Sequence, residues 1–200
     1  MFVACHLAIT YIRHFVTKEN EEKQYIGWTN VPIVKQPRVS HQLEADIVMT
    51  SDLFRCRQTA RLLFPNVVIE CSYRWRELNF GDFEGKTYEQ LKTVETYRRW
   101  LADPIRYVPP NGEAFTEFQT RIEQAISNAV SRSASHIVVV THGGVIRYVL
   151  SQYAPDVRPF WEWHVPFGEG VTLYNTKERW KERKRCISLA AVRFKESENG

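Results

Sequence analysis

The sequence has little of what marks several large classes of protein. Its four cysteines, Cys5, Cys56, Cys71 and Cys186, form no Cys-x-x-Cys pair, so we expect reduced, buried thiols and not a small disulfide scaffold. No apolar run is long enough to cross a membrane. The N-terminus lacks the basic, apolar and small-residue succession of a secretory signal. We therefore expect a cytoplasmic protein that has no membrane partner.

Internal repeats, low-complexity tracts and Gly/Ser linkers are also absent. We expect one domain over residues 1–200, with residues 196–200 as a disordered tail. The net charge of +4 is a small excess that suits a small anionic substrate, whereas nucleic acid favours a concentrated basic stripe. The basic stretch 177–185 contains Glu178 and Glu182 and is typical of a solvated turn. We therefore expect no nucleic-acid partner.

Short apolar runs alternate with helical patterns along the chain. We predict strands at residues 8–12, 47–50, 67–71 and 136–141, and a closing pair at 171–174 and 186–194. Helices are predicted at 53–64, 87–102, 113–131 and 145–153, the first with Ser51 as its N-cap and Asp52 as its first-turn acid. This alternation predicts an α/β fold, a three-layer α/β/α sandwich with a mostly parallel central sheet.

The segments between these elements are less regular. Residues 15–38 are predicted to form a long loop of the kind that often carries function, and residues 39–44 at most a short helix. In the helix at 87–102, the residues expected on one face are Leu91, Val94, Tyr97 and Leu101. The aromatic cluster of Trp161, Trp163, His164 and Phe167 fits either the core or a wall of a substrate pocket.

Two histidines follow predicted strands directly. His14 ends the first strand after Arg13, and His142 follows the strand at 136–141. Because ligands bind beyond the carboxyl ends of strands in an open α/β sheet, the two histidines meet if their strands are neighbours. Gly143 and Gly144 then open a helix, whose free N–H groups attract an anion.

An arginine and several carboxylates complete the candidate site. Arg55 lies one turn into the helix at 53–64, and helical side chains lean back toward the N-terminus. Its guanidinium can therefore reach the same edge of the sheet and bind phosphate oxygens. Glu77, Asp82 and Glu84 lie among aromatic residues and glycines, where a carboxyl group can act as a proton donor. Composition and spacing do not choose among the three.

These motifs resemble those of the histidine phosphatase superfamily, in its phosphoglycerate mutase-like branch. The resemblance runs in the family's order through Arg13-His14 with Thr17 and Asn20, the helix segment 51–60, the acid-bearing loop 77–85 and the strand end 139–144. It implies a phosphoglycerate mutase-like fold and a phosphoric monoester hydrolase that needs no metal or other cofactor. His14 would be the phosphorylated nucleophile and Glu77 the proton donor. Arg13, Arg55 and a protonated His142 would hold the phosphoryl group, with Asn20 as a further contact.

One more stretch resembles the α-ribazole phosphatases within this superfamily. Tyr97 and Trp100 form a Tyr-x-x-Trp pair, and the segment 109–118 matches a Pro-x-Asn-Gly-Glu-x-Phe-x-x-Phe pattern. The resemblance implies a small phosphorylated metabolite as substrate, with α-ribazole 5′-phosphate of cobalamin biosynthesis as the candidate. A broad-specificity sugar-phosphate phosphatase and a binding protein without turnover stay open, as do a monomer and a homodimer.

The sequence also departs from the family beside the nucleophile. Phe15 and Val16 stand where the family has Gly and Glu. Phenylalanine cannot adopt glycine-only dihedral angles, and valine removes a carboxylate. The segment 32–46 is also shorter than the family's usual helix there. We therefore expect an altered pocket mouth around His14.

Overall fold

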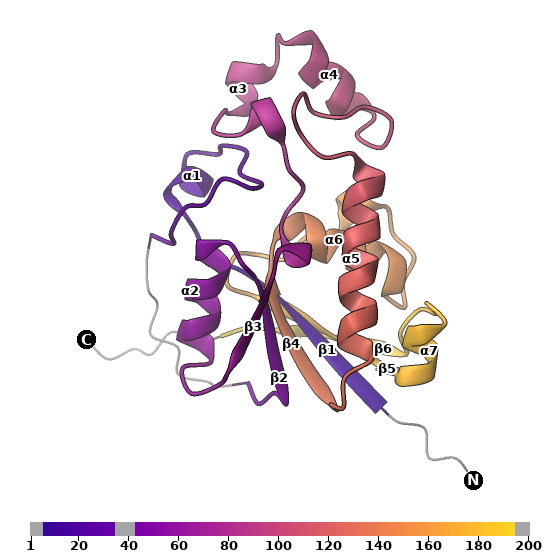
Figure 1. The fold of residues 1–200 in the computed structure, drawn as a ribbon. Coiled ribbons are helices and arrows are strands. Elements are labelled where there is room, and N and C mark those ends of the chain that lie inside the picture. Colours follow the sequence, from indigo (N-terminus) through magenta and orange to yellow (C-terminus); the bar gives the residue numbers. More distant parts are fainter. Residues whose placement is uncertain (1–5, 35–42, 195–200) are drawn as a thin grey trace.

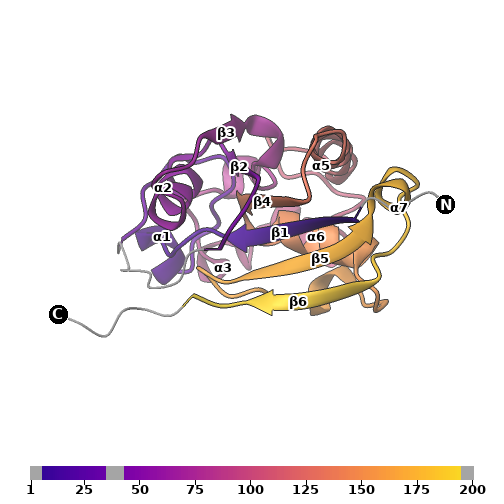
Figure 2. The ribbon, with the colours of Figure 1, turned by 90° about the horizontal axis from the view of Figure 1, so that it is seen from below.

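The computed structural model describes residues 6–34 and 43–194, and a six-stranded sheet forms its middle layer. The sheet order is β3-β2-β4-β1-β5-β6 (Figures 1 and 2). The strands are β1 (His6–Arg13), β2 (Ile47–Ser51), β3 (Ile69–Ser72), β4 (His136–Thr141), β5 (Gly170–Thr176) and β6 (Ser188–Val192). Strands β3, β2, β4 and β1 are parallel neighbours, whereas β5 runs antiparallel to both β1 and β6. The predicted mostly parallel sheet is confirmed.

Helices cover both faces of this sheet and complete the predicted three layers. They are α1 (Lys18–Glu21), α2 (Phe54–Leu63), α3 (Tyr88–Leu91), α4 (Glu95–Ala102), α5 (Phe115–Val130), α6 (Gly143–Tyr153) and α7 (Lys177–Lys181), with short 3-10 turns η1 (Tyr73–Trp75), η2 (Gly81–Phe83) and η3 (Phe160–Glu162). None of the helices described is long and apolar enough to span a membrane.

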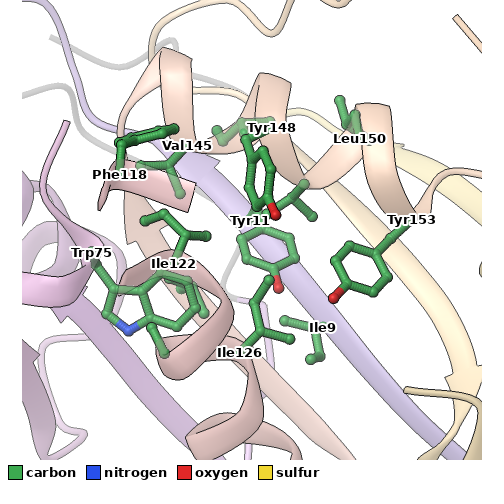
Figure 3. Close-up of a cluster of buried hydrophobic side chains, with 14 of the residues drawn as sticks. Ile9, Tyr11, Trp75, Phe118, Ile122, Ile126, Val145, Tyr148, Leu150 and Tyr153 are labelled. Atoms are coloured by element: carbon green, nitrogen blue, oxygen red, sulfur yellow. The ribbon is translucent and has the colours of Figure 1, made fainter. Parts of the chain in front are cut away.

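Side-chain alternation along the strands explains the two-sided core. Ile9 and Tyr11 of β1 pack in the larger cluster with α5 and α6, whereas Ile12 packs on the opposite face with α2. Figure 3 shows the larger cluster, where Ile122 and Ile126 of α5 lie close to the residues of β1. Both faces of the central strands are buried, and this is why residues 137–140 of β4 are all apolar.

The start of α2 differs from the prediction. Ser51 and Asp52 do not cap it, because Leu53 is the N-cap and makes no side-chain cap hydrogen bond. Asn30 from the preceding loop accepts the Phe54 N–H at 2.6 Å instead. Asp52 forms a two-bond ion pair with Arg76, both bonds at 2.7 Å. Asp52, predicted as the first-turn acid of α2, is therefore bonded to an arginine 24 residues away in the sequence.

The region 87–102 is also corrected. It forms two short helices, α3 and α4, and the buried residues are Leu91, Tyr97 and Trp100. Val94 and Leu101, predicted on the buried face, are exposed. The break at residues 92–94 rotates the second helix, so a single helical stripe does not describe the pair.

Smaller differences concern the loops and the thiols. The predicted loop at 15–38 contains α1, whose capping box joins Thr17 and Asn20. The turn at 177–185 contains α7, which buries Trp180 against Tyr153. Cys56 and Cys186 are buried as predicted, whereas Cys71 is exposed. Cys5, residues 39–42 of the proposed short helix and the predicted tail 196–200 lie outside the described residues.

Candidate active site

The two strand-end histidines meet, as the sequence predicts. Strands β1 and β4 are parallel neighbours, with Arg13 in register with Thr141, so their carboxyl ends lie together (Figure 1). The ring centroids of His14 and His142 are 5.1 Å apart, in an edge-to-face arrangement. Both side chains are buried, at 4% and 1% exposure.

A backbone contact fixes the tautomer of His14. Its Nδ1 lies 2.7 Å from the carbonyl oxygen of Phe15. A carbonyl oxygen can only accept, so Nδ1 carries the proton and Nε2 keeps its lone pair. Burial, with help from Arg55, lowers the pKa of His14 well below its ordinary value of 6.5. The imidazole is therefore neutral near pH 7, as a nitrogen nucleophile must be.

Burial first, then Arg55 and His14, lower the pKa of His142 well below 6.5, so its side chain is neutral in the chain by itself. The predicted protonated His142 concerns the site with a phosphoryl group and stays a prediction. His142 is the N-cap of α6, and its Nε2 lies 3.3 Å from the Sγ of Cys56. Burial raises the pKa of this thiol to about 12, so Cys56 is a packing neighbour of His142 and not a nucleophile.

Arg55 reaches the sheet edge as predicted, and the loop that follows α1 fixes its position. The side chain is fully buried. Its Nη1 donates to Thr29 O at 2.8 Å and its Nη2 to Gly27 O at 2.7 Å, while its Nε is buried without a partner among the described residues. A buried donor of this kind costs about 1–3 kcal/mol unless something binds it. The unpaired Nε marks a place for an anion.

Arg13 also has a buried Nε–H that finds no partner among the described residues. Its Nη1 donates to Val165 O at 3.0 Å. Burial lowers the pKa of Arg13 to about 10, which leaves the guanidinium charged at neutral pH. Two arginines therefore each bring a cationic N–H without a protein acceptor to the buried histidines.

The structure distinguishes the three candidate acids. Glu77 is buried, and its two carboxylate oxygens accept the Leu78 N–H at 2.9 Å and the Gly144 N–H at 2.8 Å. The second of these bonds places Glu77 at the start of α6, beside His142. Asp82 is exposed, and its carboxylate accepts from the side-chain amide of Asn111 at 3.1 and 3.2 Å. Glu84 binds the backbone of Trp28 and Thr29.

Asn20 is occupied by a local structural role. Its Oδ1 accepts the Thr17 N–H at 3.2 Å, and its own N–H donates to Thr17 Oγ1 at 3.2 Å. This capping box orders α1 in the loop that follows His14. Contact between Asn20 and a substrate stays a prediction.

A cavity of about 210 Å³ opens beside Glu77. Its lining includes Glu77, Gly144 and Arg147. The rest is mostly aromatic, formed by Tyr25, Phe80, Trp100, Phe115, Phe118, Phe160 and Trp161. Of the predicted aromatic cluster, Trp161 is therefore a pocket wall, Trp163 is buried in the core and Phe167 lies beside His14.

Three residues support the site in roles that were not predicted from the sequence, and one of them is Glu84, which the sequence offered only as a candidate acid. Thr59 accepts the Phe15 N–H at 3.0 Å and donates to Arg55 O at 2.8 Å, which ties α2 to the nucleophile's loop. Arg121 of α5 donates to the carbonyl oxygen of Glu77 at 2.7 Å. Glu84 fixes the segment 27–29 that receives Arg55. All three residues contact segments that are distant in the sequence, which the sequence pattern does not reveal. The exception is the spacing of Arg55 and Thr59, which lie one helical turn apart and can therefore be expected to contact each other.

Phe15 and Val16 are accommodated without backbone strain. Phe15 is not among the residues with positive φ. Its ring fills the space beside Gly168, where a Cβ atom would stand 2.6 Å from the ring. Gly168 has a φ of +75°, so a glycine in a second loop makes room for the phenylalanine.

Metal-ligand geometry is missing from residues 6–34 and 43–194. They contain no group of three or more His, Cys, Asp or Glu side chains that could hold a metal ion. The side chains that the structure brings together at the site are two imidazoles, two guanidinium groups and a carboxyl group.

Comparison with known proteins places this chain in a family. The model of the histidine phosphatase superfamily (branch 1) matches residues 9–187, and the chain belongs to that superfamily. The predicted class, a phosphoric monoester hydrolase of the histidine phosphatase type, is confirmed at the level of the family.

The chain also has named relatives. It is 30% identical over 154 residues to the adenosylcobalamin/α-ribazole phosphatase of Salmonella typhimurium, an alignment that covers 70% of this chain and 76% of that protein. The α-ribazole phosphatase structure from Shigella flexneri matches with a TM-score of 0.77 and 24% identity, over 96% of each chain. A phosphoglycerate mutase structure from Thermus thermophilus matches with a TM-score of 0.72 and 27% identity, over 94% of this chain and 100% of that one. The predicted phosphoglycerate mutase-like fold is confirmed.

Proposed function

We propose that the protein is a metal-independent phosphomonoesterase that acts through a phosphohistidine on His14. The observation that carries this proposal is the neutral, Nδ1-protonated imidazole close to Arg13 and Arg55, whose buried Nε–H groups have no acceptor among the described residues. A dianionic phosphoryl group supplies the acceptors that these donors lack.

The first step transfers the phosphoryl group to the enzyme. Nε2 of His14 attacks phosphorus, an N–P bond forms, and the ester P–O bond breaks with its electron pair going to the leaving oxygen. Glu77 in its protonated form gives its proton to that oxygen. Arg13 and Arg55 stabilise the charge on the equatorial oxygens, and His142, neutral in the chain by itself, contributes an imidazole N–H.

The second step releases phosphate. The Glu77 carboxylate takes a proton from a water molecule, whose oxygen attacks phosphorus on the side opposite His14. The N–P bond breaks, and its electron pair returns to Nε2. Inorganic phosphate leaves, and His14 and Glu77 have regained their starting protonation states.

The cavity beside Glu77 supports a leaving group with an aromatic part. Glu77 protonates the leaving oxygen, so the rest of that group lies next to this carboxyl, where seven aromatic side chains line the wall. Aromatic walls favour a flat apolar ring, whereas a bare sugar would leave its hydroxyl groups without partners. We therefore propose α-ribazole 5′-phosphate, which carries a planar aromatic base, as the substrate, in keeping with the named function of the Salmonella relative.

A substrate panel tests this proposal. We expect kcat/KM to be highest for α-ribazole 5′-phosphate. Ribose 5-phosphate is the matched control, because it keeps the phosphoester and lacks the aromatic base. Glucose 6-phosphate and 3-phosphoglycerate complete the panel, and rates are measured with and without a chelator. Equal, slow hydrolysis of all four would favour a broad-specificity sugar-phosphate phosphatase, and binding without hydrolysis would favour a phospholigand-binding protein. Loss of activity with the chelator would overturn the metal-free mechanism.

A further inference from the structure

Phe167 contacts both the nucleophile and the first arginine and has no part in the two steps above. The Cζ atom of Arg13 lies 3.5 Å from the centroid of the Phe167 ring. The ring centroids of Phe167 and His14 are 5.5 Å apart. One aromatic side chain thus covers a face of the guanidinium and borders the imidazole.

Gly143 covers the opposite face of the Arg13 guanidinium. A Cβ atom at Gly143 would stand 3.2–3.4 Å from Cζ, Nε and Nη2 of Arg13, a nearly equal distance that places it above the guanidinium plane. The Phe167 ring already occupies one face at 3.5 Å, so Gly143 lies on the other. The guanidinium is held between an aromatic ring and the backbone, and only its edge can meet an anion.

The bonding along that edge leaves one side open. Nη1 donates to Val165 O at 3.0 Å, whereas the buried Nε has no partner among the described residues. A planar guanidinium that is stacked on both faces and bonded at Nη1 cannot rotate its fork. The Nε side of the fork is therefore preorganised for an acceptor.

The loop that carries Phe167 is itself tied to the end of β1. The Gly168 N–H donates to Arg13 O at 3.0 Å, and the Arg13 N–H donates to Glu169 O at 2.9 Å. The Phe15 ring packs on Gly168 from the nucleophile's side. These contacts hold the two residues that follow Phe167, Gly168 and Glu169, against the end of β1.

We propose that Phe167 is a positioning residue that holds the Arg13 guanidinium edge-on to the phosphoryl group. The inference rests on the proposed function, because it takes Arg13 to bind that group. The face of the aromatic ring, more than its volume, carries the effect, since a cation–π contact needs the π system.

Calorimetric titration with inorganic phosphate tests this role without turnover. Phe167→Leu keeps apolar bulk and loses the aromatic face, and we expect the Kd for phosphate to rise about 2- to 30-fold, the range for one cation–π contact. Phe167→Tyr keeps the face and should stay within about 2-fold of the wild type. Melting temperatures show whether each variant is folded, and Phe167→Met replaces the leucine variant with the same expectation if that variant fails to fold.

A double-mutant cycle with Arg13→Gln makes the test specific. If Phe167 acts through Arg13, adding Phe167→Leu to Arg13→Gln should change the Kd by less than about 2-fold. Two outcomes would overturn the role of Phe167 and leave the proposed function standing. In one, Phe167→Leu weakens phosphate binding equally with and without Arg13→Gln. In the other, Phe167→Leu has no effect on the Kd of the wild type although Arg13→Gln weakens binding. If the wild type binds no phosphate and Arg13→Gln has no effect on turnover, the proposed function itself fails.

Discussion

Glu77 and Asp82 are five residues apart and have opposite environments. Glu77 is buried against the first turn of α6, and its oxygens accept backbone N–H groups from Leu78 and Gly144. Gly144 permits this approach, because a Cβ atom there would stand 2.1 Å from the carboxylate. Asp82 is exposed, and its carboxylate accepts from Asn111. Spacing alone could not separate the two acids, whereas burial does.

The pair offers a matched test of the proton donor. Glu77→Gln removes the transferable proton with almost no change in shape, and we expect kcat for an alkyl phosphate to fall about 10²- to 10⁴-fold. Asp82→Asn should leave kcat within about 2-fold of the wild type. Steady-state rates of the two variants check this, and near wild-type turnover by Glu77→Gln would refute the assignment.

Helix α5 holds the loop that presents Glu77. Arg121 of this helix is 7% exposed and donates to the backbone oxygens of Arg74, Arg76 and Glu77. It also forms a buried two-bond ion pair with Glu113, at 2.6 and 2.8 Å. One side chain thus joins α5 to the turn at η1 and to the acid-bearing loop.

Removing Arg121 should therefore affect stability and activity together. Arg121→Met leaves Glu113 buried without its partner, and we expect the free energy of unfolding to fall by about 3–5 kcal/mol. Residual activity should fall as well, because the loop of Glu77 loses its anchor. Arg99→Met is the control, since its ion pair with Glu95 is exposed and should contribute less than about 1 kcal/mol. Urea unfolding of the two variants measures their free energies of unfolding. An equal loss of stability in Arg121→Met and Arg99→Met would contradict the role of Arg121.

Elements with a strong local pattern were predictable from the sequence. Strand β4 and helix α5 follow their hydrophobic periodicity, and the meeting of His14 with His142 follows from strand ends in a parallel sheet. The predicted start of α2 was wrong, because Asp52 forms an ion pair with Arg76 from a distant segment and does not serve the first turn of the helix. The roles of Arg121 and Phe167 depend on contacts between distant segments, which periodicity does not encode. The neutral state of His142 depends on burial that only the packed structure defines.

At the scale of the whole molecule, the two buried histidines of the site make the free energy of unfolding depend on pH. His14 and His142 have pKa values well below 6.5 in the folded protein, whereas in the unfolded chain they titrate near 6.5. Below pH 6.5 the unfolded state therefore binds more protons, and the free energy of unfolding falls as the pH falls. Above pH 6.5 both histidines are neutral in both states, and their contribution does not change.

The expected slope is about 1.4 kcal/mol per pH unit for each fully depressed histidine. His14→Gln should remove one such contribution, while His142 and the partly buried His136, whose pKa is also lowered, keep theirs. Urea unfolding at several pH values between about 5 and 7.5 measures the slope. A free energy of unfolding that is flat through this range would mean that the histidines are not held neutral.

The most direct test of the account is to trap the phosphoryl group on the chain. The enzyme variant is Glu77→Gln and the substrate p-nitrophenyl phosphate, whose leaving group needs no proton, so the first step proceeds and the hydrolysis step is slowed. After an alkaline quench, which preserves phosphohistidine, peptide mass spectrometry locates the phosphate. The account predicts phosphate on His14, and none when His14→Gln is combined with Glu77→Gln. Phosphate on another residue, or full turnover by the His14→Gln variant, would contradict it.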